Sequence, residues 1–135
     1  MHIFFVNSIK ILSREKNIIT YKLTLISDNW LKCIQNISYS NYNTKPQKIF
    51  DIIKNMLAVN DLIVDSDSFD SIQSDVKINY ITNGNDNTIS AIKYLLSKLY
   101  YYENKDNSLK AIVYDEINNK FKAMDFASNI SLLPV

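Results

Sequence analysis

The sequence is poor in the residues that most often build turns, disulfides and catalytic centres. Its 135 residues include one glycine, two prolines, one cysteine and one histidine. A single cysteine excludes an internal disulfide, and a single glycine excludes a glycine-rich loop that cradles phosphate. Turns must then be made by Asn, Asp and Ser. Catalysis by histidine is a poor expectation as well, because His2 stands one residue from the N-terminus, where chain ends fray.

The chain also lacks an excess of charge and a long apolar run. The formal net charge is +1, and neither sign is gathered into a block, which argues against nucleic-acid binding and against a membrane surface as partner. The segment 1–6 is apolar, but it has no basic flank and is too short for a signal peptide or a membrane span. We therefore expect synthesis inside the cell and no association with a membrane.

What the chain does contain is enough apolar surface for one core. Hydrophobic residues make up 47% of the sequence, and the length suits a single domain over residues 1–135. Segments that alternate with a period of two stand beside segments with a helical period, which predicts an α+β fold.

The opening third predicts two strands, about His2 to Leu12 and Ile18 to Ser27, joined by the charged turn 13–17. In the second strand four large residues share one face, and these are Ile19, Tyr21, Leu23 and Leu25. This alternation is typical of a half-buried antiparallel strand, so that face is expected to look toward the core.

Two helices are predicted next. Asp28 is suited to cap a short helix that carries Trp30 and Cys33, and a longer amphipathic helix is expected from about Pro46 to Val59. The start of the longer helix has two solutions. Thr44 with Gln47 can form a capping box, or Lys45 can be the cap with Pro46 at the first helical position.

The second half predicts a strand, a polar turn, a long helix and a hairpin. The strand is 77–81, the turn 83–87, and the helix Thr88 to Tyr102 with an apolar half. Strands at 111–114 and 120–124 follow, with Asn118 and Asn119 expected to form a two-residue turn because Asn tolerates positive φ angles.

Tyr94 and Tyr101 fall on the polar half of this helix, seven residues apart and therefore nearly in line. Exposed tyrosines provide rigid contact area at interfaces, so Tyr94, Tyr101 and the intervening Lys98 are candidate interface residues. The alternative is that the rings lean onto another element of the same chain. Tyr100 and Tyr102 point in other directions and are expected to pack in the core, which leaves no single platform for stacked bases.

No residue pattern predicts catalysis. Asp65, Asp67, Asp70 and Asp75 fail the spacing of a calcium loop and are expected to form a solvated acidic connection, anchored by Phe69 and Ile72. Cys33 lies among apolar residues, where a buried and inert thiol is expected. Glu103 or Glu116 with an aspartate would be needed for a glycosidase pair. We expect no enzyme activity, no cofactor and no metal.

The order of these segments resembles the baseplate hub family of contractile-tailed phages and the related spike proteins of type VI secretion. The likeness runs from Tyr21 to Phe126 and rests on 21–27, Trp30-Leu31, 37–40, 45–53, 78–80, 85–88, 91–99 and 101–115. It implies a barrel-like antiparallel sheet with two main helices packed outside. Hub proteins are usually longer, so the chain is expected to be a single hub-like unit or part of a longer hub protein.

The resemblance also implies a structural role. Hub proteins form a trimeric ring between the tail tube and the central spike, with a channel for genome delivery, so the expected location is the tail baseplate of a virion assembled in the host cytoplasm. The alternatives are a tail-associated cell-wall hydrolase and a small nucleic-acid-binding domain that uses Tyr and Lys.

Overall fold

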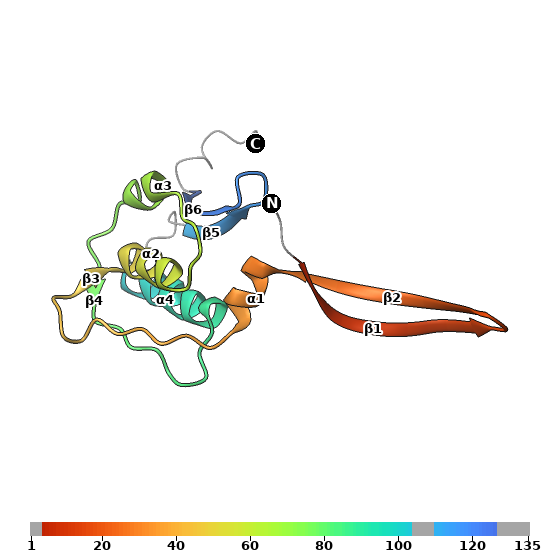
Figure 1. Cartoon of the computed structure of the whole chain (residues 1–135). Helices are drawn as coiled ribbons and strands as arrows, with labels where there is room; N and C mark the ends of the chain where they lie inside the picture. The colour runs from red at the N-terminus through yellow and green to blue at the C-terminus, as the bar shows by residue number, and fades with distance from the viewer. Residues whose placement is uncertain (1–3, 104–109, 127–135) are drawn as a thin grey trace.

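The computed structural model describes residues 4–103 and 110–126 (Figure 1). The elements, in chain order, are β1 (Phe4–Glu15), β2 (Ile18–Ser27), α1 (Asp28–Ile34), β3 (Gln47–Lys48), α2 (Ile49–Val59), α3 (Ser66–Asp70), β4 (Lys77–Ile78), α4 (Thr88–Glu103), β5 (Lys110–Asp115) and β6 (Lys120–Asp125). This mixture confirms the α+β class.

The expected barrel is not closed in the part of the chain that the structure describes. The strands form three separate antiparallel pairs, β1 with β2, β3 with β4 and β5 with β6. Two strands cannot wrap around a core, so the core lies between helices instead of inside a sheet. The expectation that the helices cover the outside of a barrel is therefore wrong.

Helix α2 is the centre of the core. Its buried residues are Ile49, Phe50, Ile52, Ile53, Met56 and Leu57. Against them pack α4, through the buried stripe Ala91, Leu95 and Leu99, and α3, through Phe69. The hairpin β5–β6 covers a further side and contributes Ala123. The predicted anchors Phe69 and Ile72 are confirmed as buried.

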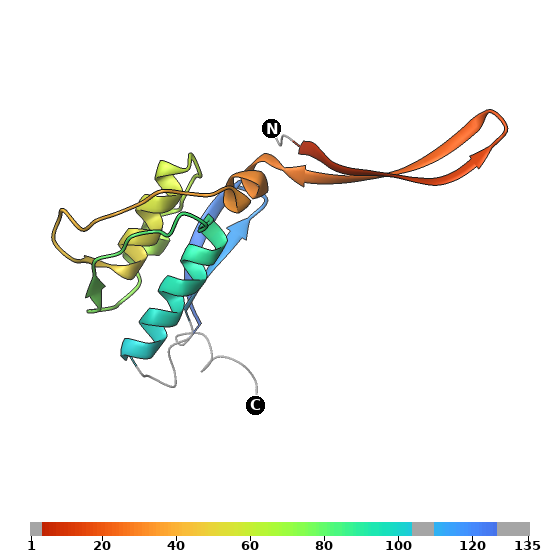
Figure 2. The ribbon, with the colours of Figure 1, turned by 90° about the horizontal axis from the view of Figure 1, so that it is seen from below.

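The first hairpin leaves this body as a long arm, which we call the arm (residues 4–27). It projects from α1 away from all the other elements in both views (Figures 1 and 2). Every residue of β1 and the first eight residues of β2 are exposed. The prediction that one face of β2 looks toward the core is wrong, because no helix or strand of the described chain lies over the arm.

The starts of two helices differ from the sequence prediction. Helix α2 begins at Ile49, not at Pro46, because Gln47 and Lys48 pair with Ile78 and Lys77 as β3 and β4; neither proposed cap is used. Helix α1 is capped by Ser27, one residue before the predicted cap Asp28, and the Ser27 Oγ accepts from the amide of Trp30 at 3.1 Å.

The last three elements, α4, β5 and β6, follow the sequence prediction closely. Helix α4 covers 88–103, and Asn87 caps it by accepting from the Ser90 amide at 2.9 Å. Strand β5 pairs with β6 from Lys110 opposite Asp125 to Asp115 opposite Lys120. The turn therefore has four residues and not two, since the Asp115 carboxylate accepts from the amides of Ile117 and Asn118 and holds the loop open. Asn119 does take the predicted positive φ, at 56°.

Candidate interaction surfaces

One face of the arm is apolar over most of its length and carries one charged residue, Arg14, opposite Ile19 near the tip. We call seven of its apolar residues the apolar arm face, and these are Val6, Ile9, Ile11, Ile19, Tyr21, Leu23 and Leu25. Their exposed fractions lie between 41% and 62%. An exposed apolar patch of this extent marks a surface that another molecule covers. An isolated two-stranded hairpin is also only marginally stable in water, so the arm gains stability by being covered.

Two irregularities in β1 create this face. The register between the strands shifts between Val6 and Ser8 and again between Ile11 and Ser13. Each extra residue reverses the side to which the following residues point. As a result Val6, Ile9 and Ile11 all stand opposite apolar residues of β2, although their spacing in the sequence does not follow a simple period of two.

The other face of the arm is polar and basic in its middle part, with apolar Phe5 and Ile26 at its foot and Ile18 at its tip. Opposed pairs of small polar residues, Ser8 with Thr24 and Ser13 with Thr20, flank Lys10 directly opposite Lys22. Two like charges at opposed positions repel each other. The arm carries Lys10, Arg14, Lys16 and Lys22 against Glu15 alone, a formal charge of +3 within a chain of +1, so the rest of the chain carries −2. The ion pairs found among the described residues join side chains of the body only.

An apolar groove lies on the body where the arm begins, and we call it the foot groove. It has a volume of about 430 Å³ and is walled by α1, α4 and the hairpin β5–β6. Its main apolar lining residues are Trp30, Ile89, Ile92, Leu96, Ile112 and Phe121. Cys33 also lines it, and burial raises the pKa of this thiol to about 11, so the thiol is protonated at neutral pH. This agrees with the inert thiol that the sequence predicts.

Polar contacts fix one wall of the foot groove. The amide of Asn29, on α1, donates to the Tyr114 hydroxyl at 2.6 Å and to Asn119 Oδ1 at 2.7 Å, and Tyr114 also donates to Asn119. Tyr114 packs against Phe121 with ring centroids 5.0 Å apart. These contacts join α1, at the foot of the arm, to the hairpin β5–β6. The same hydrogen bonds therefore hold both the start of the arm and one wall of the groove in place.

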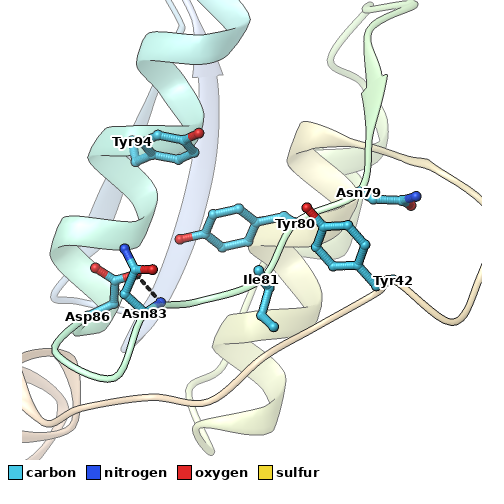
Figure 3. Close-up of a pocket in the computed structure, with 7 residues that line it drawn as sticks. All are labelled: Tyr42, Asn79, Tyr80, Ile81, Asn83, Asp86 and Tyr94. Carbon is cyan, nitrogen blue, oxygen red and sulfur yellow. Dashed lines mark hydrogen bonds between the residues drawn. The ribbon is translucent and has the colours of Figure 1, made fainter.

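A second hollow, of about 230 Å³, contains tyrosines and lies between the start of α4 and the strand-like segment around Tyr80 (Figure 3). The rings of Tyr80 and Tyr94 stack with centroids 5.6 Å apart. Burial, followed by the charge of Asp86, raises the pKa of Tyr80 to about 12. Asn41 holds this segment in place, because its side chain accepts from the Tyr80 amide and donates to the Ile78 carbonyl.

The candidate interface residues of α4 lie on one side of this hollow and beyond it. Tyr94 is 48% exposed although it stacks on Tyr80, and Lys98 Nζ lies 5.5 Å from the centroid of the Tyr94 ring. Tyr101 is 74% exposed and its ring meets that of Tyr102 at 5.5 Å. Their role at an interface stays a prediction.

The expectation that Tyr100 and Tyr102 pack in the core is wrong, since they are 64% and 55% exposed. The buried stripe of α4 is narrow and runs through Ala91, Leu95 and Leu99. Residues one and three positions past Leu99 fall to either side of that stripe, where no described element covers them.

The acidic connection does not gather its carboxylates. Asp70 accepts from Lys54 at 2.9 Å, and Asp65 lies 3.9 Å from Lys120, so these two face different cations. A short helix, α3, which the sequence did not reveal, occupies the middle of the segment. Glu116 is exposed and lines the foot groove, while the side chain of Glu103 and all of His2 lie outside the described residues.

Within the described ranges no three side chains of the kinds that hold metals lie together, and no helix there has the length and apolarity to span a membrane.

Comparisons with known proteins give no assignment. No protein-family model matches the chain, and neither a curated protein nor a solved structure matches it.

The exposure of the apolar arm face is what the sequence prediction missed. Its signal was present in the length of the two strands, 12 and 10 residues, against a usual five or six. Strands of that length, with no third strand next to them in the chain, extend beyond what a small body can cover.

Proposed function

We propose that this protein is a structural subunit that joins other proteins, and that it is a component of a phage tail baseplate hub, located between the tail tube and the central spike. The observation that carries the proposal is the apolar arm face, on which seven large side chains stay exposed. Catalytic side chains would be expected around a cleft. The side chains of the apolar arm face instead lie on a projecting hairpin, where other subunits can contact them. No cofactor is needed for that role.

The order of segments that resembles the hub family supports the particular assembly. Hubs are expected to be homotrimers that contact tube and spike proteins and that line part of the channel for genome delivery. The barrel-like sheet implied by the family would have to be completed by strands of neighbouring subunits, because each sheet in the described chain has two strands. Unpaired strand edges on the arm provide backbone groups for such pairing.

The test is reconstitution with tail proteins. Full-length protein is mixed with the tube protein and the spike protein of a contractile tail encoded beside it, and mass is measured by size-exclusion chromatography with light scattering. We expect a complex that contains this chain and at least one of the two proteins. Particles that assemble normally in a phage from which this gene has been deleted would contradict the proposal.

A nucleic-acid-binding role is a second candidate because of one observation, the basic charge of the arm. Two-stranded ribbons can enter a groove of DNA, and the opposed Lys10 and Lys22 would meet phosphates. The apolar arm face argues against nucleic-acid binding by the arm, since its seven large apolar side chains would then stay in water or lie against phosphates. A gel shift whose affinity falls steeply with salt would favour this candidate, and no shift at low salt would remove it.

A further inference from the structure

We propose that the apolar arm face of one copy of this protein docks in the foot groove of a second copy. This inference rests on the proposed role in assembly and names the partner of the arm, whichever larger structure the subunits enter.

The arm cannot fill the groove of its own chain. Ser27 and Trp30, at the foot of the arm, are themselves part of the groove lining, and from there the arm points away from the body in both views (Figures 1 and 2). At about 3.3 Å per residue, the ten residues of β2 carry the far end roughly 30 Å from this point. The side chains of Ile9, Leu23 and Ile19 therefore reach a groove only on another molecule.

The two surfaces match in chemistry and size. Both are predominantly aliphatic, and a groove of about 430 Å³ has room for several side chains of the arm. Docking would cover Trp30, which is 52% exposed and is the only tryptophan of the chain. It would also place a second layer over the two-stranded arm, which supplies the support that an isolated hairpin lacks.

Charge favours a second copy over an unrelated apolar partner. The arm carries +3 and the remainder of the chain −2, so the arm of one copy is attracted to the body of another, and two arms repel each other. The groove lining itself holds one charge of each sign, Glu116 and Lys93, so the attraction comes from the net charges of the arm and the body. Arm-to-arm packing through the same apolar faces is thereby disfavoured.

The contact is heterologous, because arm and groove are different surfaces. Each copy offers one arm and one groove, so a repeated contact closes into a ring when its rotation permits. A ring leaves no arm uncovered, whereas a two-fold arm-to-arm pair would leave both foot grooves open.

The first test uses Trp30 as a sensor in the unmodified full-length protein. Tryptophan emission is recorded over a dilution series in which mass is followed by light scattering. We expect emission to move to shorter wavelength as the mass rises, because docking removes Trp30 from water. Association without any change in Trp30 emission would overturn the inference.

The second test identifies the two surfaces by cross-linking, in a Cys33→Ala background that removes the native thiol. Chains with Leu23→Cys on the apolar arm face are mixed with tagged chains carrying Ile92→Cys in the groove, and a short thiol-to-thiol cross-linker is added. Thr24→Cys is the matched control, because Thr24 is next to Leu23 in the sequence and lies on the opposite face. Far-ultraviolet circular dichroism confirms that each variant is folded.

We expect the mixed product from Leu23→Cys with Ile92→Cys, at least tenfold above that from Thr24→Cys. Cross-links mainly between two Leu23→Cys chains would show arm-to-arm packing and overturn the inference. A protein that stays monomeric at all concentrations yet binds tube or spike protein would overturn it as well, while leaving the proposed function intact. A protein that forms arm-to-groove rings but binds neither tail protein would support the inference and contradict the proposed function.

Discussion

Replacing large residues of the apolar arm face should weaken association strongly and leave the fold intact. In the triple variant Ile9→Thr, Leu23→Thr and Leu25→Thr, threonine keeps the β preference of the strands. The three side chains are 62%, 55% and 55% exposed, so about half of their surface is already in water. The free energy of unfolding of the monomer is therefore expected to change by no more than about 1 kcal/mol.

The effect on association follows from the same exposure. Complete burial of a Leu or Ile side chain is worth about 1.5–3 kcal/mol, and the half still exposed here can contribute about 0.8–1.5 kcal/mol when a partner covers it. Three such losses amount to about 2.4–4.5 kcal/mol, which raises the dissociation constant by a factor of about 60 to 2,000. Light scattering over a dilution series measures this change.

A core leucine gives the matched contrast. Leu57 has no exposed surface, so Leu57→Ala is expected to lower the free energy of unfolding by about 2–5 kcal/mol in urea titrations. If the arm variant unfolds as easily as Leu57→Ala, its apolar face is buried within its own chain and the reasoning fails. A second control, Thr20→Ala with Thr24→Ala on the polar face, should leave the dissociation constant unchanged.

Three further outcomes are expected. Tyr94→Ala combined with Tyr101→Ala should weaken association with the monomer still folded, and an unchanged mass profile would count against these rings as interface residues. Cys33 should react slowly with a thiol reagent at pH 8 and rapidly in urea, since burial raises the pKa of its thiol to about 11; equal rates would contradict its burial. Asp115 has a lowered pKa because the side chain and amide of Asn118, and then Lys122, favour the charged carboxylate. The stabilisation that the Asp115 carboxylate provides is present above the ordinary carboxyl pKa of about 3.9 and is lost as the pH falls below that value. The urea midpoints measured at pH 7 and at pH 3 should therefore differ less in Asp115→Asn than in the parent chain.

Local patterns were enough to predict the elements whose own residues decide them. The apolar half of α4 and its Asn-rich cap were identified correctly because helical spacing and capping depend on neighbours three or four positions away. The hairpin β5–β6 was identified for the same reason, although Asp115 lengthened its turn. Each of these features is settled within a few residues of chain.

Elements that depend on distant segments were predicted less well. Helix α2 begins later than predicted because Gln47 and Lys48 pair as a strand with Ile78 and Lys77, which are distant in the sequence. Tyr100 and Tyr102 were assigned to the core because they point away from the exposed line of Tyr94 and Tyr101, but no described element covers their sides of α4. Tertiary contacts override local preference in both cases.

The candidate site shows the same division. The residues of the apolar arm face, Ile19 to Leu25 in particular, were found by their alternation, yet the direction in which they face was wrong. Alternation states that a strand has two unlike faces, and it does not say whether the apolar one meets the same chain or another. The foot groove could not be found at all, because α1, α4 and β5–β6 are distant in sequence.

Spacing and turn chemistry over short stretches are enough to establish an α+β chain with amphipathic helices and two hairpins, of which the N-terminal one is long and alternating. Only the tertiary structure decided that the helices form the core and that the first hairpin stands away from it with its apolar face in water. The reason is geometric: burial is a property of how distant segments meet, and no local pattern records what lies on the other side of a strand.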